Sequence, residues 1–231
     1  MSFQRTYSEI QECSRHTNEK DQIYVKLLSH PLSISLVYLL RNTRVTPNLI
    51  TSVSFIFSLL GVYALLRIED YVGLVLAWLF FHLALIFDSA DGQMARWKKN
   101  GTSFGAYYDI FTDFLEQRLL VVVLAIRLSY EHEDALLWGL ICLAILSLKT
   151  MQPHMKKKAI LRHGDSLGES EKKKEHPLKV AIGKLQIALD GHYLYLAIAL
   201  LGNRPMWFFY IISVWFGILI VKRFLMEFFA R

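Results

Sequence analysis

The sequence has few of the residues that stabilise small secreted domains. Among its 231 residues are two cysteines, Cys13 and Cys142, too few for a disulfide framework. The eight histidines are scattered, without the close spacing of a zinc site. The polar N-terminus lacks an apolar core followed by a small-residue cleavage site, so we expect no signal peptide. These absences argue against a disulfide-rich secreted domain and against a zinc protein.

Proline is also scarce, and the five prolines fall at or near the ends of apolar segments. This is typical of a residue that starts or stops helices. Hydrophobic residues make up 54% of the chain and are clustered. A membrane-spanning helix needs roughly 20 apolar residues. Three runs approach that length and three are weaker: Pro47–Arg67, Tyr71–Phe87 and Pro205–Val221, then Leu119–Ile126, Ala135–Leu148 and His192–Leu201. We therefore predict an all-α membrane protein with six transmembrane helices.

Positive charge is nearly absent from one set of the expected loops. Of the 26 Lys and Arg residues, only Arg67 and Arg204 lie in the outer segments that six spans would create. Three more, Arg118, Arg127 and Lys149, lie within helices. The remaining basic residues fall in segments on the other side, which the positive-inside rule assigns to the cytoplasm. The net charge of +6 therefore indicates membrane orientation and contact with anionic lipid, not nucleic-acid binding. We expect both termini in the cytoplasm.

Two regions flank the expected spans. Residues 1–28 are polar and form a cytoplasmic arm, and residues 29–231 form the membrane domain. Residues 30–41 are too short to span and are expected to lie as an amphipathic helix on the cytoplasmic membrane surface. Thr46 is suited to cap the first span, and Pro47 suits its first turn. We expect residues 153–190 to be the longest soluble segment, with a solvated middle and a short interfacial helix at Pro177–Leu189.

Four aspartates follow the second apolar run and form two helical stripes. Asp88 and Asp91 are three residues apart, with Gly92, Ala95 and Arg96 on the same stripe. Gly105, Asp109 and Asp113 are spaced four apart on the next helix. Because a cytoplasmic loop joins the two helices, they are antiparallel and the stripes can face each other. A carboxylate at the centre of a membrane helix costs about 2.5–3.5 kcal/mol, so a cluster of four needs cations.

Carboxylate oxygens that converge in this way suit Mg²⁺ or Mn²⁺. Four of them could hold two ions, which together would stabilise the attacking and leaving oxygens of a phosphoryl transfer. The glycines leave room for a ligand, and Arg96 can donate a bidentate hydrogen bond to phosphate. The alternative is that the aspartates only pair with Arg96, Arg118 or Lys98. Facing stripes with both glycines in register favour the metal site.

The stretch from Asp88 to Asp113 resembles the CDP-alcohol phosphotransferase (CDP-alcohol phosphatidyltransferase) family. It matches the family signature D-x2-D-G-x2-A-R-x8-G-x3-D-x3-D at every defined position. Six membrane helices, a surface segment before the first span and the Thr46-Pro47-Asn48-Leu49-Ile50-Thr51 start are similar to this family as well. The resemblance covers roughly residues 30–225.

This resemblance implies a function and a set of site residues. The enzyme would transfer a phospho-alcohol group from a CDP-alcohol to an acceptor hydroxyl and release CMP, with its active site open to the cytoplasm. The implied metal ligands are Asp88, Asp91 and Asp109. Asp113 would be the catalytic base and would share in a second metal site. The implied contacts of the cytidine diphosphate are Asp91, Gly92, Ala95, Arg96 and Gly105.

Several further expectations follow the signature. Arg118 and Lys149 are candidates for binding the acceptor, and Glu116 either lines the acceptor pocket or makes a polar contact between helices. The substrates could be CDP-diacylglycerol or of the inositol-phosphate type, as in phospholipid biosynthesis, or a non-lipid pair. Homodimerisation is common in the family. The rival hypothesis is a divalent-ion transporter, which the apolar outer halves of the helices disfavour because they offer no polar path.

Overall fold

The computed structural model of the protein describes residues 8–10, 23–163 and 191–229, with side chains described outside 152–163 and 226–229. Regular structure in these ranges is helical, and they contain no strand. The helices are the π-helix η1 (Val25–Ser29), α2 (His30–Leu40), α3 (Pro47–Arg67), α4 (Tyr71–Lys98), α5 (Ser103–Leu128), α6 (Ala135–His163), α8 (His192–Leu201) and α9 (Met206–Phe229).

Side-chain caps set the starts of α4 and α5, which carry the signature, and of the neighbouring α3. The Thr46 side chain accepts a hydrogen bond from the Leu49 amide at the start of α3, as predicted. Asp70 caps α4 by accepting from Gly73, and Thr102 caps α5 by accepting from Gly105. Such caps satisfy amides that have no partner within their helix. Helix α4 continues well past the predicted limit of its apolar run at Phe87 and ends at Lys98, so Asp88 and Asp91 lie inside it.

Three helices are long and apolar enough to span a membrane: Pro47–Arg67, Tyr71–Lys98 and Met206–Leu225. The described parts of two other expected spans form shorter apolar helices, Ala135–Met151 and His192–Leu201. Helix α5 has 26 residues, but acidic and basic side chains interrupt its apolar character. A membrane protein is thus supported, whereas the count of six spans remains a prediction. Helix α2 occupies the range expected for the surface helix, and its position on a membrane also remains a prediction.

Helix α6 extends through Pro153 to His163, so the first part of the segment expected to be soluble, residues 153–163, is helical. Proline removes one backbone donor and kinks a helix, but the turns on either side of it can still form. Residues 164–190, which include the interfacial helix predicted at Pro177–Leu189, lie outside the described residues, as does most of the arm before residue 23.

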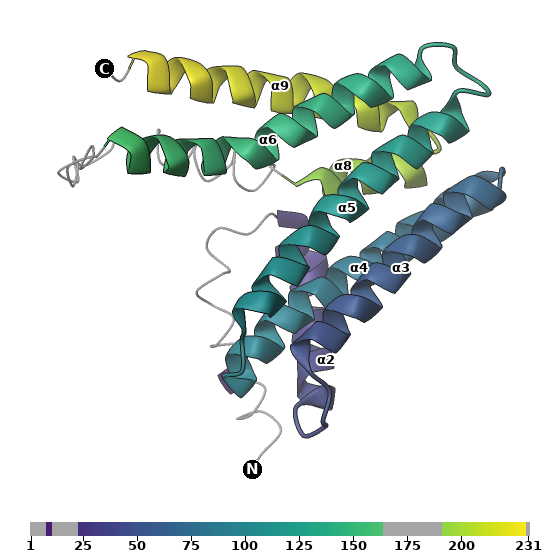
Figure 1. The fold of residues 1–231 in the computed structure, drawn as a ribbon. Helices are drawn as coiled ribbons and strands as arrows, with labels where there is room; N and C mark the ends of the chain where they lie inside the picture. Colours follow the sequence, from purple (N-terminus) through teal and green to yellow (C-terminus); the bar gives the residue numbers. More distant parts are fainter. Residues whose placement is uncertain (1–7, 11–22, 164–190, 230–231) are drawn as a thin grey trace.

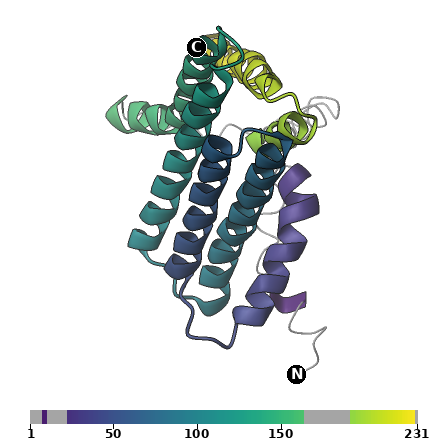
Figure 2. The same ribbon diagram turned by 90° about the vertical axis from the view of Figure 1, so that its right-hand side faces the viewer.

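Helix α3 lies between α4 and α5 and packs against both (Figure 2). Helices α6, α8 and α9 form a second group, in which α9 contacts α6 and α8 (Figure 1). The main apolar core joins the two groups through side chains that are almost fully buried, among them Phe81, Leu124, Phe208 and Phe216. Burying such side chains stabilises the fold by about 1.5–3 kcal/mol each.

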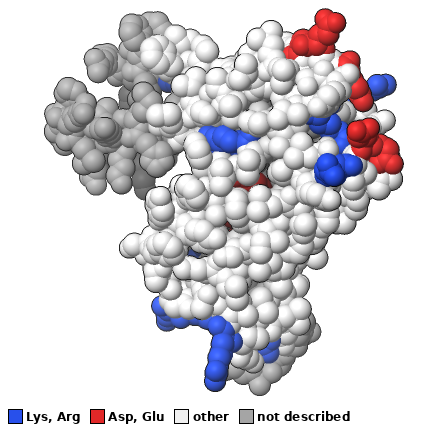
Figure 3. All heavy atoms as spheres, turned by 45° about the vertical axis from the view of Figure 1, so that its right-hand side comes forward, with Lys and Arg blue, Asp and Glu red and all other residues white. Residues whose placement is uncertain are grey.

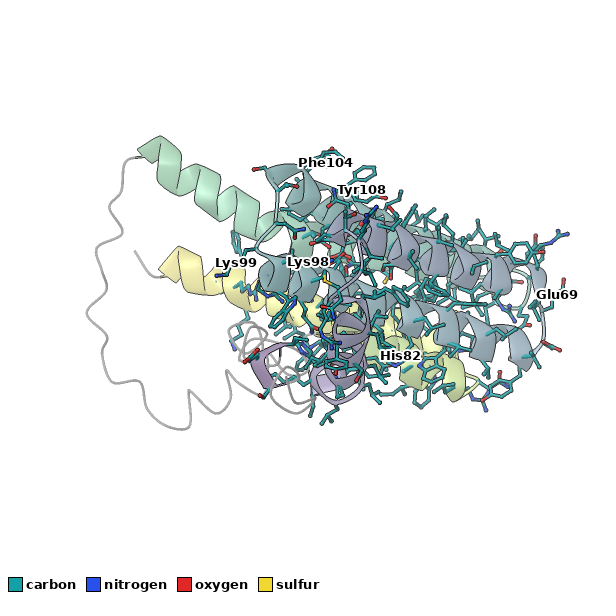
Figure 4. The ribbon with its side chains drawn as sticks, turned by 90° about the horizontal axis from the view of Figure 1, so that it is seen from below. Glu69, His82, Lys98, Lys99, Phe104 and Tyr108 are labelled. Atoms are coloured by element: carbon teal, nitrogen blue, oxygen red, sulfur yellow. The ribbon has the colours of Figure 1, made fainter. Side chains whose placement is uncertain are left out.

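The turns that follow α3, α5 and α8 meet at one end of the molecule. Residues from all three line a cavity of about 540 Å³, among them Glu69, His132 and Asn203. Figure 4 shows Glu69 at this end, whereas Lys98, Lys99 and Phe104 lie at the opposite end. The short connections therefore alternate between the ends, as antiparallel helices require.

Arg127 ties two of these turns together. Its guanidinium donates to the carbonyl oxygens of Leu65 (2.9 Å) and Ile68 (2.5 Å) near the end of α3, and to that of Glu69 (2.5 Å) in the turn. A cation at a helix C-terminus also interacts favourably with the helix dipole. Arg127 therefore links α5 to the end of α3.

We expect Arg127→Met to destabilise the fold by about 2–3 kcal/mol, because several carbonyl groups lose a charged donor at once. Thermal unfolding in detergent would measure the change. Arg67→Met removes an exposed arginine from the same end of α3 and serves as the control. Equal melting temperatures for the two variants would contradict the role given to Arg127.

Candidate functional site

Three of the four aspartates converge between α4 and α5. Asp88, Asp91 and Asp109 each offer one carboxylate oxygen, and these oxygens lie within 4.8 Å of one another. Asp91 is buried and the other two are half-buried. Oxygens bound to one Mg²⁺ at 2.0–2.1 Å are separated by up to about 4 Å, so a small inward movement would complete such a site. The arrangement and the all-oxygen donor set therefore fit Mg²⁺ or Mn²⁺.

Asp113 lies one helical turn beyond Asp109 on the same stripe of α5. It is outside the group of three, but it lines a cavity together with Asp88 and Asp109. The predicted facing of the two stripes is thus found in the structure. Asp113 thus lies beside the cluster of Asp88, Asp91 and Asp109 and faces the same cavity.

Thr51 on α3 orients one member of the cluster. Its hydroxyl donates to Oδ2 of Asp91 (2.5 Å) and also lies 3.2 Å from the Pro47 carbonyl oxygen. Both Thr51 and Asp91 are buried. A hydrogen bond of this kind fixes the orientation of the Asp91 carboxylate within the cluster. Sequence spacing does not reveal the contact, because the two residues are 40 positions apart.

A first cavity of about 500 Å³ lies where α3 and α5 begin and α4 ends. All five residues that the signature assigns to the nucleotide line it: Asp91, Gly92, Ala95, Arg96 and Gly105. A Cβ atom on Gly105 would lie 2.8 Å from the side-chain oxygen of Asn48, so a larger residue would displace that side chain from the cavity wall. A Cβ on Gly92 would lie 3.3 Å from the Arg96 guanidinium. The glycines thus keep the cavity walls close together.

A second cavity of about 320 Å³ lies on the other side of the carboxylates. It shares Asp91, Gly92, Arg96 and Asp109 with the first cavity, so the two spaces meet at the cluster. Asp88 and Asp113 from α4 and α5 also line it, and distant segments contribute Val25, His30, His192 and Tyr193. Sequence reasoning missed the contributions of η1, α2 and α8. The only available signal was the polar pair His192-Tyr193 at the start of an apolar segment.

Arg118 and Lys149 lie close to His192, which lines the second cavity. The Arg118 guanidinium donates to the Thr150 hydroxyl (2.6 Å) on α6 and lies 3.7 Å from the centre of the Phe114 ring. The Lys149 ammonium lies 3.7 Å from the centre of the Phe216 ring on α9. Neither is among the described residues that line the cavities. Acceptor binding by these two side chains remains a prediction that would require them to move.

Comparison with known proteins agrees with the arrangement. The family model for CDP-alcohol phosphatidyltransferase matches residues 44–219, and the chain belongs to this family. It is therefore an enzyme that transfers a phospho-alcohol group from a CDP-alcohol to an acceptor hydroxyl. The resemblance drawn from the signature is confirmed.

The fold is similar to a crystal structure of the Mycobacterium tuberculosis phosphatidylinositol phosphate synthase (PgsA1) in complex with manganese and citrate. The TM-score is 0.52 at 18% sequence identity, covering 83% of this chain and 87% of the other. At this identity the likeness shows a shared fold. No curated protein sequence matched the chain significantly.

We expect Thr51→Val to weaken Mn²⁺ binding about 10–100-fold, the usual effect of removing a hydrogen bond to a metal ligand. Thr51→Ser keeps the hydroxyl and should bind Mn²⁺ nearly as the unmodified protein does. Electron paramagnetic resonance of free Mn²⁺ during a titration measures both. Equal affinities for Thr51→Val and Thr51→Ser would show that the contact does not support a metal ligand.

Proposed function

We propose that this protein is a metal-dependent CDP-alcohol phosphotransferase of phospholipid synthesis, which releases CMP at the cytoplasmic membrane surface. The observation that carries the proposal is the meeting of two cavities at the cluster of carboxylates. A transfer between two substrates needs two adjoining spaces with the reacting phosphorus at their junction. The junction is where Asp88, Asp91 and Asp109 converge.

The donor occupies the first cavity in this proposal. Gly92, Ala95 and Gly105 let the nucleotide approach the helix backbones, and Arg96 donates to a phosphate oxygen. Asp88, Asp91 and Asp109 would hold one Mg²⁺ or Mn²⁺, and Asp113 would share in binding a second. When bound, these ions offset the negative charge of the diphosphate.

The acceptor occupies the second cavity, beside Asp113. The Asp113 carboxylate takes the proton of the acceptor hydroxyl, and the oxygen then attacks the phosphorus that carries the alcohol. A new phosphorus–oxygen bond forms as the bond to the CMP oxygen breaks, and the proton stays on Asp113 until it passes to water. The chain's part is mainly to position the substrates, as is usual in phosphoryl transfer.

For the substrates we propose CDP-diacylglycerol with an acceptor of the inositol-phosphate type. The support is the fold shared with a phosphatidylinositol phosphate synthase and the family match. A non-lipid CDP-alcohol pair is the alternative. The homodimer remains an expectation drawn from the family.

We also propose six spans with the site at the cytoplasmic end and α2 on the membrane surface. The acidic side chains of α5 that would oppose insertion are Asp109 and Asp113, which line the second cavity, and Glu116, which is buried. The two basic ones, Arg118 and Arg127, are hydrogen-bonded to other helices or turns. Lys98 and Lys99 lie at the end of α4 nearer the cavities, opposite Glu69 (Figure 4). On the face shown in Figure 3, acidic atoms gather mainly at the upper end, with basic ones beside them and at the lower end. Positive charge near the site is what a cytoplasmic surface favours.

Asp113→Asn should lower CMP release by about 10²–10⁴-fold or more, because the amide cannot take the proton. The assay uses purified protein, Mn²⁺, CDP-diacylglycerol and a panel that includes inositol 1-phosphate and glycerol 3-phosphate. Nucleotide binding should survive the substitution. Glu69→Gln, at the far end of the molecule, serves as the control. Near-normal activity of Asp113→Asn would refute the base assignment.

The same preparation also tests the rival hypothesis of a divalent-ion transporter. If the unmodified protein released no CMP but moved Mn²⁺ into proteoliposomes, the transporter hypothesis would replace the proposed enzyme activity.

Cysteine labelling tests the orientation. In a background carrying Cys13→Ser and Cys142→Ala, we expect Glu133→Cys to react with a membrane-impermeant maleimide in intact cells. Asn100→Cys, in the loop between α4 and α5, should react only after the membrane is opened. The reverse pattern would place the site outside the cytoplasm.

A further inference from the structure

Glu116 is a buried carboxylate that neither the metal cluster nor the cavity walls use. It lies on α5, three residues after Asp113, and is 6% exposed. Both of its oxygens accept hydrogen bonds. Oε2 accepts from the Ser58 hydroxyl on α3 (2.6 Å), and Oε1 accepts from the Tyr193 hydroxyl on α8 (2.5 Å). A buried carboxylate is costly unless it is hydrogen-bonded, and inside a membrane helix such a group usually serves function.

Tyr193 connects Glu116 to the second cavity. The Tyr193 ring is half-buried and lines that cavity opposite α5, together with Asp88 and Asp113. Its ring centre lies 4.3 Å from that of His192, which also lines the cavity. His192 is 8% exposed, and its Nε2 atom has no hydrogen-bond partner among the described residues. A buried nitrogen without a partner beside a cavity is suited to a ligand group.

Helix α8 packs against α4, and Tyr193 at its start also lies against the apolar core. Gly191 precedes the helix and provides no side-chain cap, and the helix has only ten residues. The hydroxyl of Tyr193 at the second position of α8 therefore anchors this end of the helix to α5, one turn from Asp113.

We propose that Glu116 is a positioning residue that acts through Tyr193. It holds Tyr193 and the adjoining His192 as the wall of the second cavity, at a set distance from Asp113, and so determines which acceptor fits. This inference rests on the proposed function in placing the acceptor in the second cavity. Glu116 itself touches no substrate.

The first test measures how readily a reagent reaches the second cavity, and it does not depend on catalysis. Ser89→Cys places a thiol in the second cavity, in the background that lacks Cys13 and Cys142. The rate at which a charged methanethiosulfonate reagent labels this thiol reports how accessible the second cavity is. Glu116→Ala should change this rate about fivefold or more, the factor that corresponds to one lost hydrogen bond. Glu116→Gln should restore it, since the amide offers one acceptor oxygen and one donor for the two hydroxyls.

Ser54→Ala is the matched control. It removes another buried hydrogen bond between helices, from the Ser54 hydroxyl to the Ala84 carbonyl oxygen (2.8 Å), away from Glu116. It should lower the melting temperature but leave the labelling rate unchanged. An unchanged rate in Glu116→Ala, or an equal change in Ser54→Ala, would overturn the positioning role whether or not the protein releases CMP.

The second test uses activity with CDP-diacylglycerol and inositol 1-phosphate. Glu116→Ala and Tyr193→Phe should each raise the KM for inositol 1-phosphate about fivefold or more and leave the KM for CDP-diacylglycerol within twofold. The double variant should be no worse than Glu116→Ala, because the two residues act through one contact. Additive effects, or equal changes in both KM values, would overturn the inference. Absence of CMP release from the unmodified protein would count against the proposed function, and the labelling rates would then decide the inference.

Discussion

The mutual repulsion of carboxylates gathered among apolar helices is the constraint on which this structure depends. Asp88, Asp91 and Asp109 bring their oxygens within 4.8 Å of one another, an arrangement that a bound cation would stabilise. Carboxylates that repel one another would not converge by themselves, so the packing of the surrounding helices must hold them together. Helix α3 packs against both α4 and α5, and Thr51 holds Asp91 from α3. The cluster is thus held by packing and is suited in advance to a divalent ion.

The same three helices divide the space around the cluster. The starts of α3 and α5 and the end of α4 form the first cavity, where Gly105 lets α5 approach Asn48. The second cavity needs the start of α8 and the N-terminal segment as well. The second group of helices, α6, α8 and α9, therefore contributes to the site through α8, beyond covering the apolar core. Family membership assigns the chemistry, and the two adjoining cavities fit the proposal that the donor and the acceptor bind side by side.

Much of this architecture was predictable from particular residues. Thr46 and Pro47 marked the start of α3, and the aspartate spacing predicted two facing stripes, because helical periodicity is a local property. Helix α6 continues past the predicted apolar span Ala135–Leu148 and through Pro153, since a proline often ends a helix but can also lie within one. Charged side chains inside α5 made its apolar run look short in the sequence, although the helix has 26 residues.

The sequence by itself determined the family, the helical class and the identity of the carboxylates, because the signature needs only fixed spacing along the chain. Only the tertiary structure decided which side chains complete the site. The contacts of Thr51 with Asp91 and of Glu116 with Tyr193 join residues 40 and 77 positions apart. It also left Arg118 and Lys149 out of the cavity walls. Such contacts depend on how whole helices pack, and helix packing leaves no local pattern in a sequence.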